Sequence, residues 1–103
     1  MTIEDFNTII SHDRLTLAVF YTQWCGPCKA LHLILDRLEE MRPSAVVLMR
    51  FDVDNDENFA LSQRYNIVSV PTMILFRAGK KLWRETGVLT VETLEQNIAR
   101  FRK

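Results

Sequence analysis

A strand, a helix and a second strand follow one another between residues 15 and 53, and this order constrains the fold more than any other feature of the sequence. Residues 15–21 are apolar almost without alternation, which is typical of a strand buried on both faces of a sheet. Apolar residues at helical spacing predict a helix over residues 28–41, and a second apolar strand is expected over residues 45–53. In such a unit the two strands are expected to lie parallel, and the helix is expected to cross one face of the sheet in a right-handed sense.

Capping residues and apolar stripes predict three further helices. Thr2 is suited to cap the first of them, and Thr90 begins the last. In the middle one, Phe59 and Tyr65 are expected to point inward. These helices are expected over residues 3–11, 57–65 and 90–102.

Two strands are expected over residues 72–76 and 81–86, joined by a tight turn with Gly79 in a positive φ conformation. The pattern therefore predicts a single α/β domain over residues 1–103, with a mixed central sheet of about four strands flanked by four helices. The strands are expected in the spatial order 45–53, 15–21, 72–76, 81–86, with the strand over residues 45–53 at an edge. Because an edge strand has free backbone groups, it favours weak pairing with a second copy of the chain.

The charge balance and the hydropathy exclude several classes of partner. The 13 Lys and Arg residues balance the 13 Asp and Glu residues, so we expect neither nucleic acid nor an anionic membrane as a partner. No apolar run exceeds about eight residues, well short of the roughly 20 that span a bilayer. Residues 1–5 carry acidic charge where a signal peptide carries a basic region, so we expect a cytoplasmic location.

Both cysteines of the chain, Cys25 and Cys28, lie where the first strand leads into the helix over residues 28–41. The N–H groups and the positive dipole at a helix N-terminus favour a thiolate at the first cysteine, and the spacing allows a small disulfide ring. A lone pair of this kind in a reducing compartment indicates redox chemistry or metal binding. Zinc usually takes four ligands, and His12 and His32 lack the paired spacing of zinc ligands. We therefore favour a reversible dithiol over a shared metal site or an inactive pair.

The string Trp24-Cys25-Gly26-Pro27-Cys28-Lys29 after a buried strand, with Val70-Pro71-Thr72 before a hairpin, resembles the thioredoxin family. The resemblance extends from about Phe6 to Phe101, and Gly79 and Gly87 within and after the hairpin add to it. It implies a thioredoxin fold and a protein disulfide reductase, a dithiol–disulfide oxidoreductase with no bound cofactor. It also implies two partners, which are client proteins that contain disulfides and an NADPH-dependent thioredoxin reductase.

The resemblance implies a role for each residue of these motifs. Cys25 would be the attacking thiolate and Cys28 the resolving thiol, acting through a mixed disulfide. Pro71 would be the cis-proline of the family, beside the dithiol. A shallow groove for the client would be formed by Trp24, Gly26, Pro27, Val70, Pro71 and Gly87.

The chain departs from the family pattern in the strand that leads to the dithiol. Family members usually have a buried aspartate there that accepts the proton of the resolving cysteine, but this chain has Val19. Many members pair that aspartate with a lysine, and at that position this chain has Arg50, for which a role beside the dithiol and simple exposure at the sheet end are both open. Members also begin with an additional strand, whereas only Met1 and Thr2 precede the first expected helix.

Two functions are compatible with these residues. The first is a general cytoplasmic reductant of protein disulfides that is a monomer or a weak dimer. The second is a thioredoxin-like module that docks one partner through the groove and turns over slowly, because Val19 removes the proton acceptor. An exported oxidant or isomerase is disfavoured by the Gly-Pro pair between the cysteines and by the absence of a signal-peptide pattern.

Overall fold

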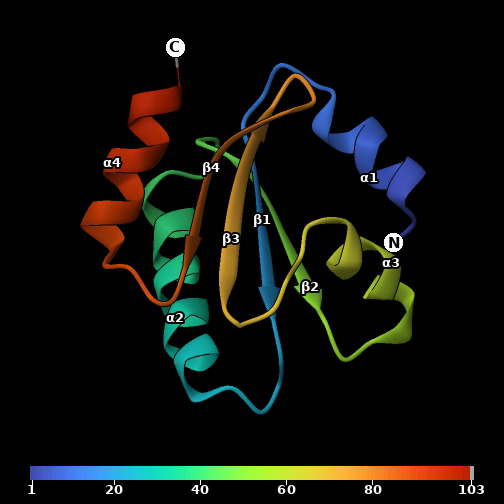
Figure 1. The fold of residues 1–103 in the computed structure, drawn as a ribbon. Coiled ribbons are helices and arrows are strands. Elements are labelled where there is room, and N and C mark those ends of the chain that lie inside the picture. The colour runs from blue at the N-terminus through green and yellow to red at the C-terminus, as the bar shows by residue number, and fades with distance from the viewer. Residues whose placement is uncertain (103) are drawn as a thin grey trace.

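Strand β1 (Thr16–Tyr21) runs through the middle of a four-stranded sheet in the computed structural model, which describes residues 1–102. It pairs in parallel with β2 (Val47–Asp52) on one side and antiparallel with β3 (Thr72–Arg77) on the other, and β3 pairs antiparallel with β4 (Lys80–Thr86) (Figure 1). The sheet order β2-β1-β3-β4 is the order predicted from the sequence, with β2 at an edge.

Helices cover both faces of this sheet. Helices α2 (Gly26–Met41) and α4 (Val91–Phe101) lie on one face, and α1 (Ile3–Ile10) and α3 (Phe59–Arg64) lie on the other (Figure 1). The 3₁₀ turn η1 (Asp56–Asn58) leads into α3. The predicted α/β class, with four strands and four helices, is confirmed, and most boundaries move by only one or two residues. No helix within residues 1–102 has both the length and the apolar character to cross a membrane.

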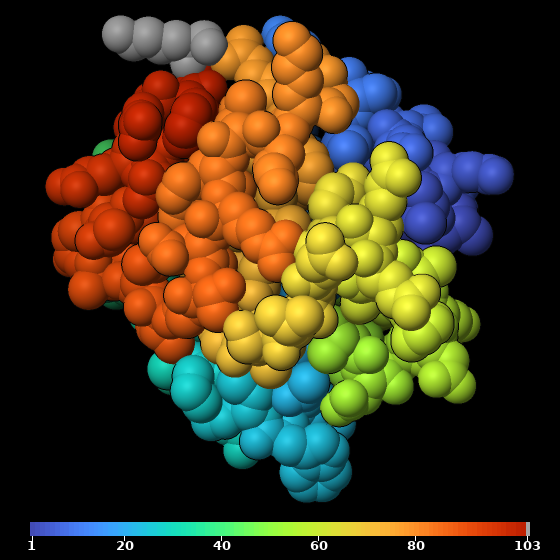
Figure 2. All heavy atoms as spheres, viewed as in Figure 1, coloured from blue at the N-terminus to red at the C-terminus, as the bar shows by residue number. Residues whose placement is uncertain are grey.

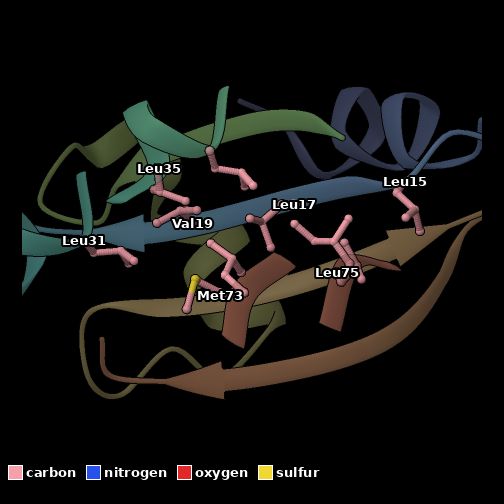
Figure 3. Close-up of a cluster of buried hydrophobic side chains, with 10 residues drawn as sticks. Leu15, Leu17, Val19, Leu31, Leu35, Met73 and Leu75 are labelled. Atoms are coloured by element: carbon pink, nitrogen blue, oxygen red, sulfur yellow. The ribbon is translucent and has the colours of Figure 1, made fainter. Parts of the chain in front are cut away.

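Strand β1 supplies side chains to a hydrophobic core on each face of the sheet. Leu17 and Val19 point toward α2 and α4, where they pack among leucines of both helices (Figure 3). Ala18 and Phe20 point the other way, toward Phe6 of α1. Because successive side chains of a strand alternate between faces, an unbroken apolar run is what a central strand of a covered sheet requires. The expectation that residues 15–21 form a strand buried on both faces is therefore confirmed.

The first and last helices begin at threonines whose side chains satisfy free backbone donors. The Asp5 N–H donates to Oγ1 of Thr2 at 3.0 Å, and the Thr93 N–H donates to Oγ1 of Thr90 at 3.1 Å. Such caps stabilise a helix by about 0.5–2 kcal/mol and fix its first residue. These two helix starts are thus encoded locally, and both agree with the sequence pattern.

Glycine closes the hairpin and follows it. Gly79 has a φ of +80° in the turn between β3 and β4, as predicted, and Ala78 before it has a φ of +51°. Gly87 has a φ of +99° directly after β4. A residue without Cβ adopts these conformations at little cost, so β4 can end abruptly and turn back beside the loop that precedes β3.

The expectation that Phe59 points inward is wrong, since its side chain is 60% exposed. Helix α3 is short and turns Leu61 into the core instead. Two positions along an α-helix differ in direction by about 200°, so a buried Leu61 forces Phe59 outward. Tyr65, four positions after Leu61, packs at the edge of the same core as predicted.

Candidate active site

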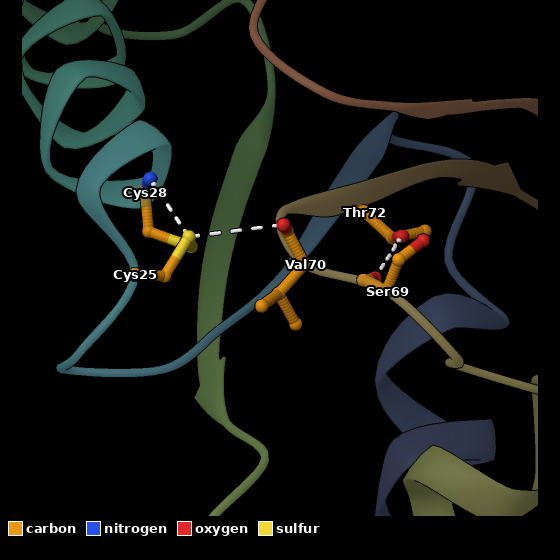
Figure 4. Close-up of a disulfide and its surroundings, with 5 residues drawn as sticks. All are labelled: Cys25, Cys28, Ser69, Val70 and Thr72. Atoms are coloured by element: carbon orange, nitrogen blue, oxygen red, sulfur yellow. Dashed lines mark hydrogen bonds between the residues drawn. A yellow bond between two sulfur atoms is a disulfide. The ribbon is translucent and has the colours of Figure 1, made fainter.

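Cys25 and Cys28 form a disulfide at the N-terminus of α2, with Cα atoms 5.2 Å apart (Figure 4). Cys25 is the N-cap of the helix, and the Cys28 N–H donates to its Sγ at 3.1 Å. Pro27 lies in the first turn, where its missing N–H removes no helical hydrogen bond. The local sequence therefore places the Cys25 sulfur at the positive end of the helix dipole, in hydrogen-bonding contact with a backbone donor.

The two cysteines differ in exposure. Cys28 is only 1% exposed, whereas Cys25 is partly buried and lies at the surface. Beside it, Trp24 is 89% exposed, and Gly26 and Pro27 are also exposed. A large substrate can therefore approach the Cys25 sulfur but not the Cys28 sulfur, and an exposed aromatic ring lies next to the point of approach.

The loop before β3 lies against the disulfide. The carbonyl oxygen of Val70 is 3.7 Å from Sγ of Cys25 (Figure 4). The Val70–Pro71 peptide bond is cis, as the resemblance implies. The Gly87 N–H donates to the Pro71 carbonyl oxygen at 2.8 Å. The structure thus brings together Val70, Pro71 and Gly87 from two separate segments, and sets Val70 beside the dithiol.

The Thr72 hydroxyl, which the sequence pattern did not identify as part of the site, holds this loop in place. Oγ1 of Thr72 donates to the Ser69 carbonyl oxygen at 2.7 Å, and it also lies 3.1 Å from Oγ1 of Thr86 on β4. Thr72 itself is fully buried. Its position in the Val-Pro-Thr string was a signal, but only the pairing of β3 with β4 shows that Thr86 is its partner.

Val19 is fully buried in the apolar core behind α2 (Figure 3). Its neighbours in that cluster include Leu31 and Leu35 of α2, and it has Arg50 as its register partner on β2. A valine has no proton to exchange, and no hydrogen bond to the Cys28 sulfur is formed within residues 1–102. The departure from the family pattern at this position therefore leaves an apolar environment where a carboxyl group is usual.

Arg50 pairs with α2 rather than extending freely into solvent. Its Nη1 donates to Nδ1 of His32 at 2.9 Å, and its Nη2 donates to Oδ1 of Asp36 at 2.7 Å and to Oε1 of Glu39 at 3.3 Å. The ring of His32 also packs edge-on against Tyr21, with centroids 4.6 Å apart. These contacts place the Arg50 guanidinium in a polar cluster along the side of α2, and none of them involves Cys25 or Cys28.

The environment of His32 disfavours its charged form. Burial lowers the pKa of His32 below its usual 6.5, the Arg50 charge lowers it further, and Asp36 opposes this shift. Because Arg50 is always a donor, Nδ1 of neutral His32 is the acceptor and its proton is on Nε2. No group of three His, Cys, Asp or Glu side chains is arranged to hold a metal ion within residues 1–102.

The thioredoxin family model matches residues 1–100 of the chain. The chain belongs to the thioredoxin family. It is 37% identical to "Thioredoxin-2, mitochondrial" of Schizosaccharomyces pombe over 99 residues, which are 96% of this chain and 71% of the relative. It is 33% identical to the thioredoxin of Alicyclobacillus acidocaldarius, covering 96% of this chain and 94% of that one. Among solved structures, a mutant thioredoxin from Halobacterium salinarum aligns with a TM-score of 0.85 at 29% identity, over 100% of this chain and 88% of that chain.

Membership of this family establishes the class of reaction. Thioredoxins are dithiol–disulfide oxidoreductases, and this chain has the Cys-x-x-Cys disulfide at the helix N-terminus that the reaction uses. The chain is a protein disulfide reductase. Proteins with disulfides and a thioredoxin reductase are the general partners that the family implies.

Proposed function

We propose that the two cysteines have fixed and different roles, with Cys25 as the nucleophile and Cys28 as the resolving thiol. The single observation that supports this most strongly is the unequal exposure of the two sulfurs, because Cys28 is 1% exposed and Cys25 lies at the surface. The contact from the Cys28 N–H to the Cys25 sulfur supports the same assignment, since a backbone donor at a helix N-terminus stabilises a thiolate.

The proposed reaction has two exchange steps. The Cys25 thiolate attacks one sulfur of the client disulfide, so that a mixed disulfide forms while the client S–S bond breaks and one client thiolate leaves. Cys28 then loses its proton and attacks Sγ of Cys25. The mixed disulfide breaks, the second client thiolate leaves, and Cys25 and Cys28 become the disulfide seen in the structure. Two electrons pass to the client and remain in its thiols, and an NADPH-dependent thioredoxin reductase supplies two further electrons from NADPH that reduce the Cys25–Cys28 disulfide again.

The client lies, in this proposal, across a shallow surface around Cys25. Exposure of Trp24, Gly26 and Pro27 supports it, as does the position of the Val70 carbonyl oxygen 3.7 Å from Sγ of Cys25. An extended client segment that pairs with backbone groups there would be bound with little dependence on its sequence. The groove is assigned to Trp24, Gly26, Pro27, Val70, Pro71 and Gly87.

Trapping of the mixed disulfide tests the two roles. Cys28→Ser should accumulate a covalent adduct with a client disulfide, because the second attack is blocked. Cys25→Ser is the matched control and should form no adduct, because Cys28 is shielded. Mass spectrometry of the adducts identifies the linked cysteine. An adduct through the remaining cysteine of Cys25→Ser, or none with Cys28→Ser, would contradict the assignment.

The cellular setting belongs to the same proposal. A reversible dithiol works as a reductant where the compartment keeps it reduced, which supports a cytoplasmic location. The proposal also has the chain act as a monomer or a weak dimer. The free edge of β2 is the surface through which a weak dimer would form. Fractionation of cells that express the chain at natural levels tests the location, and sedimentation velocity over a range of concentrations tests the oligomeric state.

A slow docking module is the second candidate, and the burial of Val19 in an apolar cluster favours it. Without a proton acceptor the second step is slow at neutral pH, and the mixed disulfide is long-lived. Steady-state reduction of insulin in the presence of a thioredoxin reductase and NADPH separates the candidates. A reductant turns over many times, whereas a docking module stops after about one equivalent.

A further inference from the structure

The end of the molecule opposite the dithiol is basic, although the chain as a whole has no net charge. Strands β1 and β2 begin at this end, and β3 turns into β4 there. The dithiol follows the other end of β1, so the length of that strand, about 20 Å, separates the two places. Figure 2 shows the red end of α4 and the orange hairpin at one end of the molecule, and the cyan segment of the dithiol at the other.

Four segments that are far apart in the chain supply this charge. They are the loop before β1, the loop between α2 and β2, the hairpin turn with the start of β4, and the end of α4. Seven of the 13 Lys and Arg residues lie in these segments, against one acidic residue, Asp13. The seven, here called the basic end, are Arg14, Arg42, Arg77, Lys80, Lys81, Arg100 and Arg102. A balanced total charge therefore conceals a positive surface.

Hydrogen bonds hold these segments against one another. Arg77, the last residue of β3, donates from Nε to Oδ1 of Asp13 at 3.3 Å and from Nη1 to the Phe101 carbonyl oxygen at 3.1 Å. The Ala78 N–H donates to the His12 carbonyl oxygen at 2.9 Å. The loop before β1, the hairpin and the end of α4 are thus joined. A surface that is already ordered loses little conformational entropy when a ligand binds.

Most cations of the basic end are not neutralised by the fold. Arg77 pairs with Asp13, and Arg42 pairs with Glu95. The other five are exposed and form no ion pair within residues 1–102. Cations at a helix C-terminus offset the negative end of the helix dipole. That effect accounts for the arginines of α4, but not for the cations of the hairpin or of the loop before β1.

A hollow of about 350 Å³ lies between the end of α4 and the hairpin. Its apolar lining comes from Ala78, Leu82 and Phe101, and the last two of these are half-buried. Lys80 and Arg100 line the same hollow, and both are exposed. A recess of this kind accepts an apolar side chain. The cations beside it attract carboxylates next to that side chain.

A second hollow, of about 480 Å³, lies between the end of α4 and the loop from α2 to β2. It combines the same chemistry, since Met41 and Pro43 line it together with Arg42 and Arg102. Phe101 lines the first hollow and the next residue lines the second. Consecutive Cα atoms are only about 3.8 Å apart, so one bound segment can reach both hollows.

We propose that the basic end binds an acidic segment of another protein, in which apolar residues alternate with Asp or Glu. An acidic protein is favoured over an anionic membrane because Leu82 and Phe101 line a recess, whereas a membrane-binding surface inserts its apolar groups into the bilayer. A nucleic acid backbone would likewise leave the apolar recess empty. Because the dithiol is at the opposite end, such a partner would hold the chain while Cys25 stays open to a client.

Binding of peptides without cysteine tests the basic end separately from the dithiol reaction. Three fluorescent peptides of equal length are compared by fluorescence anisotropy, with alternating Glu-Leu, alternating Glu-Ser and alternating Lys-Leu. The Glu-Leu peptide should bind about three- to tenfold more tightly than the Glu-Ser peptide. Its affinity should fall as salt is added, and the Lys-Leu peptide should not bind.

A double variant and a matched control locate the effect. Lys80→Gln with Arg100→Gln should weaken binding of the Glu-Leu peptide by about three- to tenfold, because both cations line the smaller hollow. Arg37→Gln with Arg64→Gln removes the same charge from exposed positions on α2 and α3, outside the basic end, and should weaken binding by less than about twofold. Insulin reduction by the double variant at the basic end should equal that of the unmodified chain, which also shows that the variant is folded.

The remaining outcomes identify a wrong partner or a wrong place. Equal affinities for the Glu-Leu and Glu-Ser peptides, or an equal loss of affinity in both double variants, would overturn the proposal. Phosphatidylserine vesicles or a single-stranded DNA oligonucleotide that bound more tightly than the Glu-Leu peptide, at equal anionic charge, would overturn it in favour of that partner. Inhibition of insulin reduction by saturating Glu-Leu peptide would place the peptide at the dithiol and would also overturn it. Normal insulin reduction without peptide binding would overturn the basic end as a docking surface and leave the function of the dithiol unaffected.

Discussion

Val19 lies directly opposite Arg50 in the parallel register of β1 and β2, yet the two residues do not form the acid–base pair that the family pattern has at these positions. Val19 is buried among leucines, and the guanidinium of Arg50 is turned toward the carboxylates of Asp36 and Glu39. The chain has therefore replaced a buried polar pair by an apolar contact and a surface cluster. The replacement affects the step in which Cys28 must lose its proton.

Val19→Asp should shorten the lifetime of the mixed disulfide at pH 7 by about ten- to a hundredfold, because a general base would again be available to Cys28. Val19→Asn is the matched control, since the asparagine side chain resembles that of aspartate in size and polarity but cannot accept a proton from Cys28. Stopped-flow measurement of product release gives the rate for each protein. A lifetime that is unchanged in Val19→Asp, or shortened as much in Val19→Asn, would contradict a role for proton transfer. In the unmodified chain the same rate should rise steadily toward alkaline pH.

His32 should make the chain less stable as the pH falls. Burial and the Arg50 charge lower the pKa of His32 in the folded state, so below pH 6.5 the unfolded state binds more protons than the folded state. The stabilisation is complete above pH 6.5 and is lost as the pH falls through the folded pKa, where protonation also breaks the bond from Arg50 to Nδ1. Urea unfolding at pH 7.5 and pH 5.5 measures the change. His32→Gln should show a smaller difference between the two pH values, and an equal difference would assign the effect to other groups.

Ser62→Ala should stabilise the protein slightly, by up to about 1 kcal/mol, because it removes a shielded hydroxyl that has no hydrogen-bond partner. Ser69→Ala is a useful comparison. The Ser69 carbonyl accepts a bond from Thr72 whatever its side chain is, so this substitution should change the free energy of unfolding little. Urea unfolding measures both proteins. Destabilisation by Ser62→Ala would show that the hydroxyl has a partner in solution, for example a bound water.

Leu35→Ala should destabilise the protein by about 2–5 kcal/mol, because Leu35 is fully buried between α2 and the sheet. Leu33→Ala, two positions away on the same helix, should change the free energy of unfolding by less than about 0.5 kcal/mol, because Leu33 is exposed. The pair has the same chemistry and the same helix propensity, so the difference isolates burial. Similar effects of both substitutions would contradict the assigned orientation of α2.

The architecture could be predicted from the sequence because its signals are local. The alternation of β1 between two cores, the caps at Thr2 and Thr90 and the turn at Gly79 each depend on residues close together in the chain. The position of the dithiol follows in the same way, since a strand that leads into a helix places both cysteines at the helix N-terminus. Resemblance to a family then identified the roles of Cys25 and Cys28, which periodicity alone does not show.

What only the tertiary structure decided are contacts between segments far apart in the chain. The orientation of Phe59 depended on which residue of a short helix the core accepts, and the core accepted Leu61. The partners of Arg50 depended on how α2 lies beside β2, and the hollow lined by Phe59 and Val68 exists only because α3 and the loop before β3 meet. Sequence patterns report the preferences of neighbouring residues, whereas these contacts follow from packing whole elements together. The sequence therefore determined the fold and the chemistry of the dithiol, and the tertiary structure decided what surrounds it.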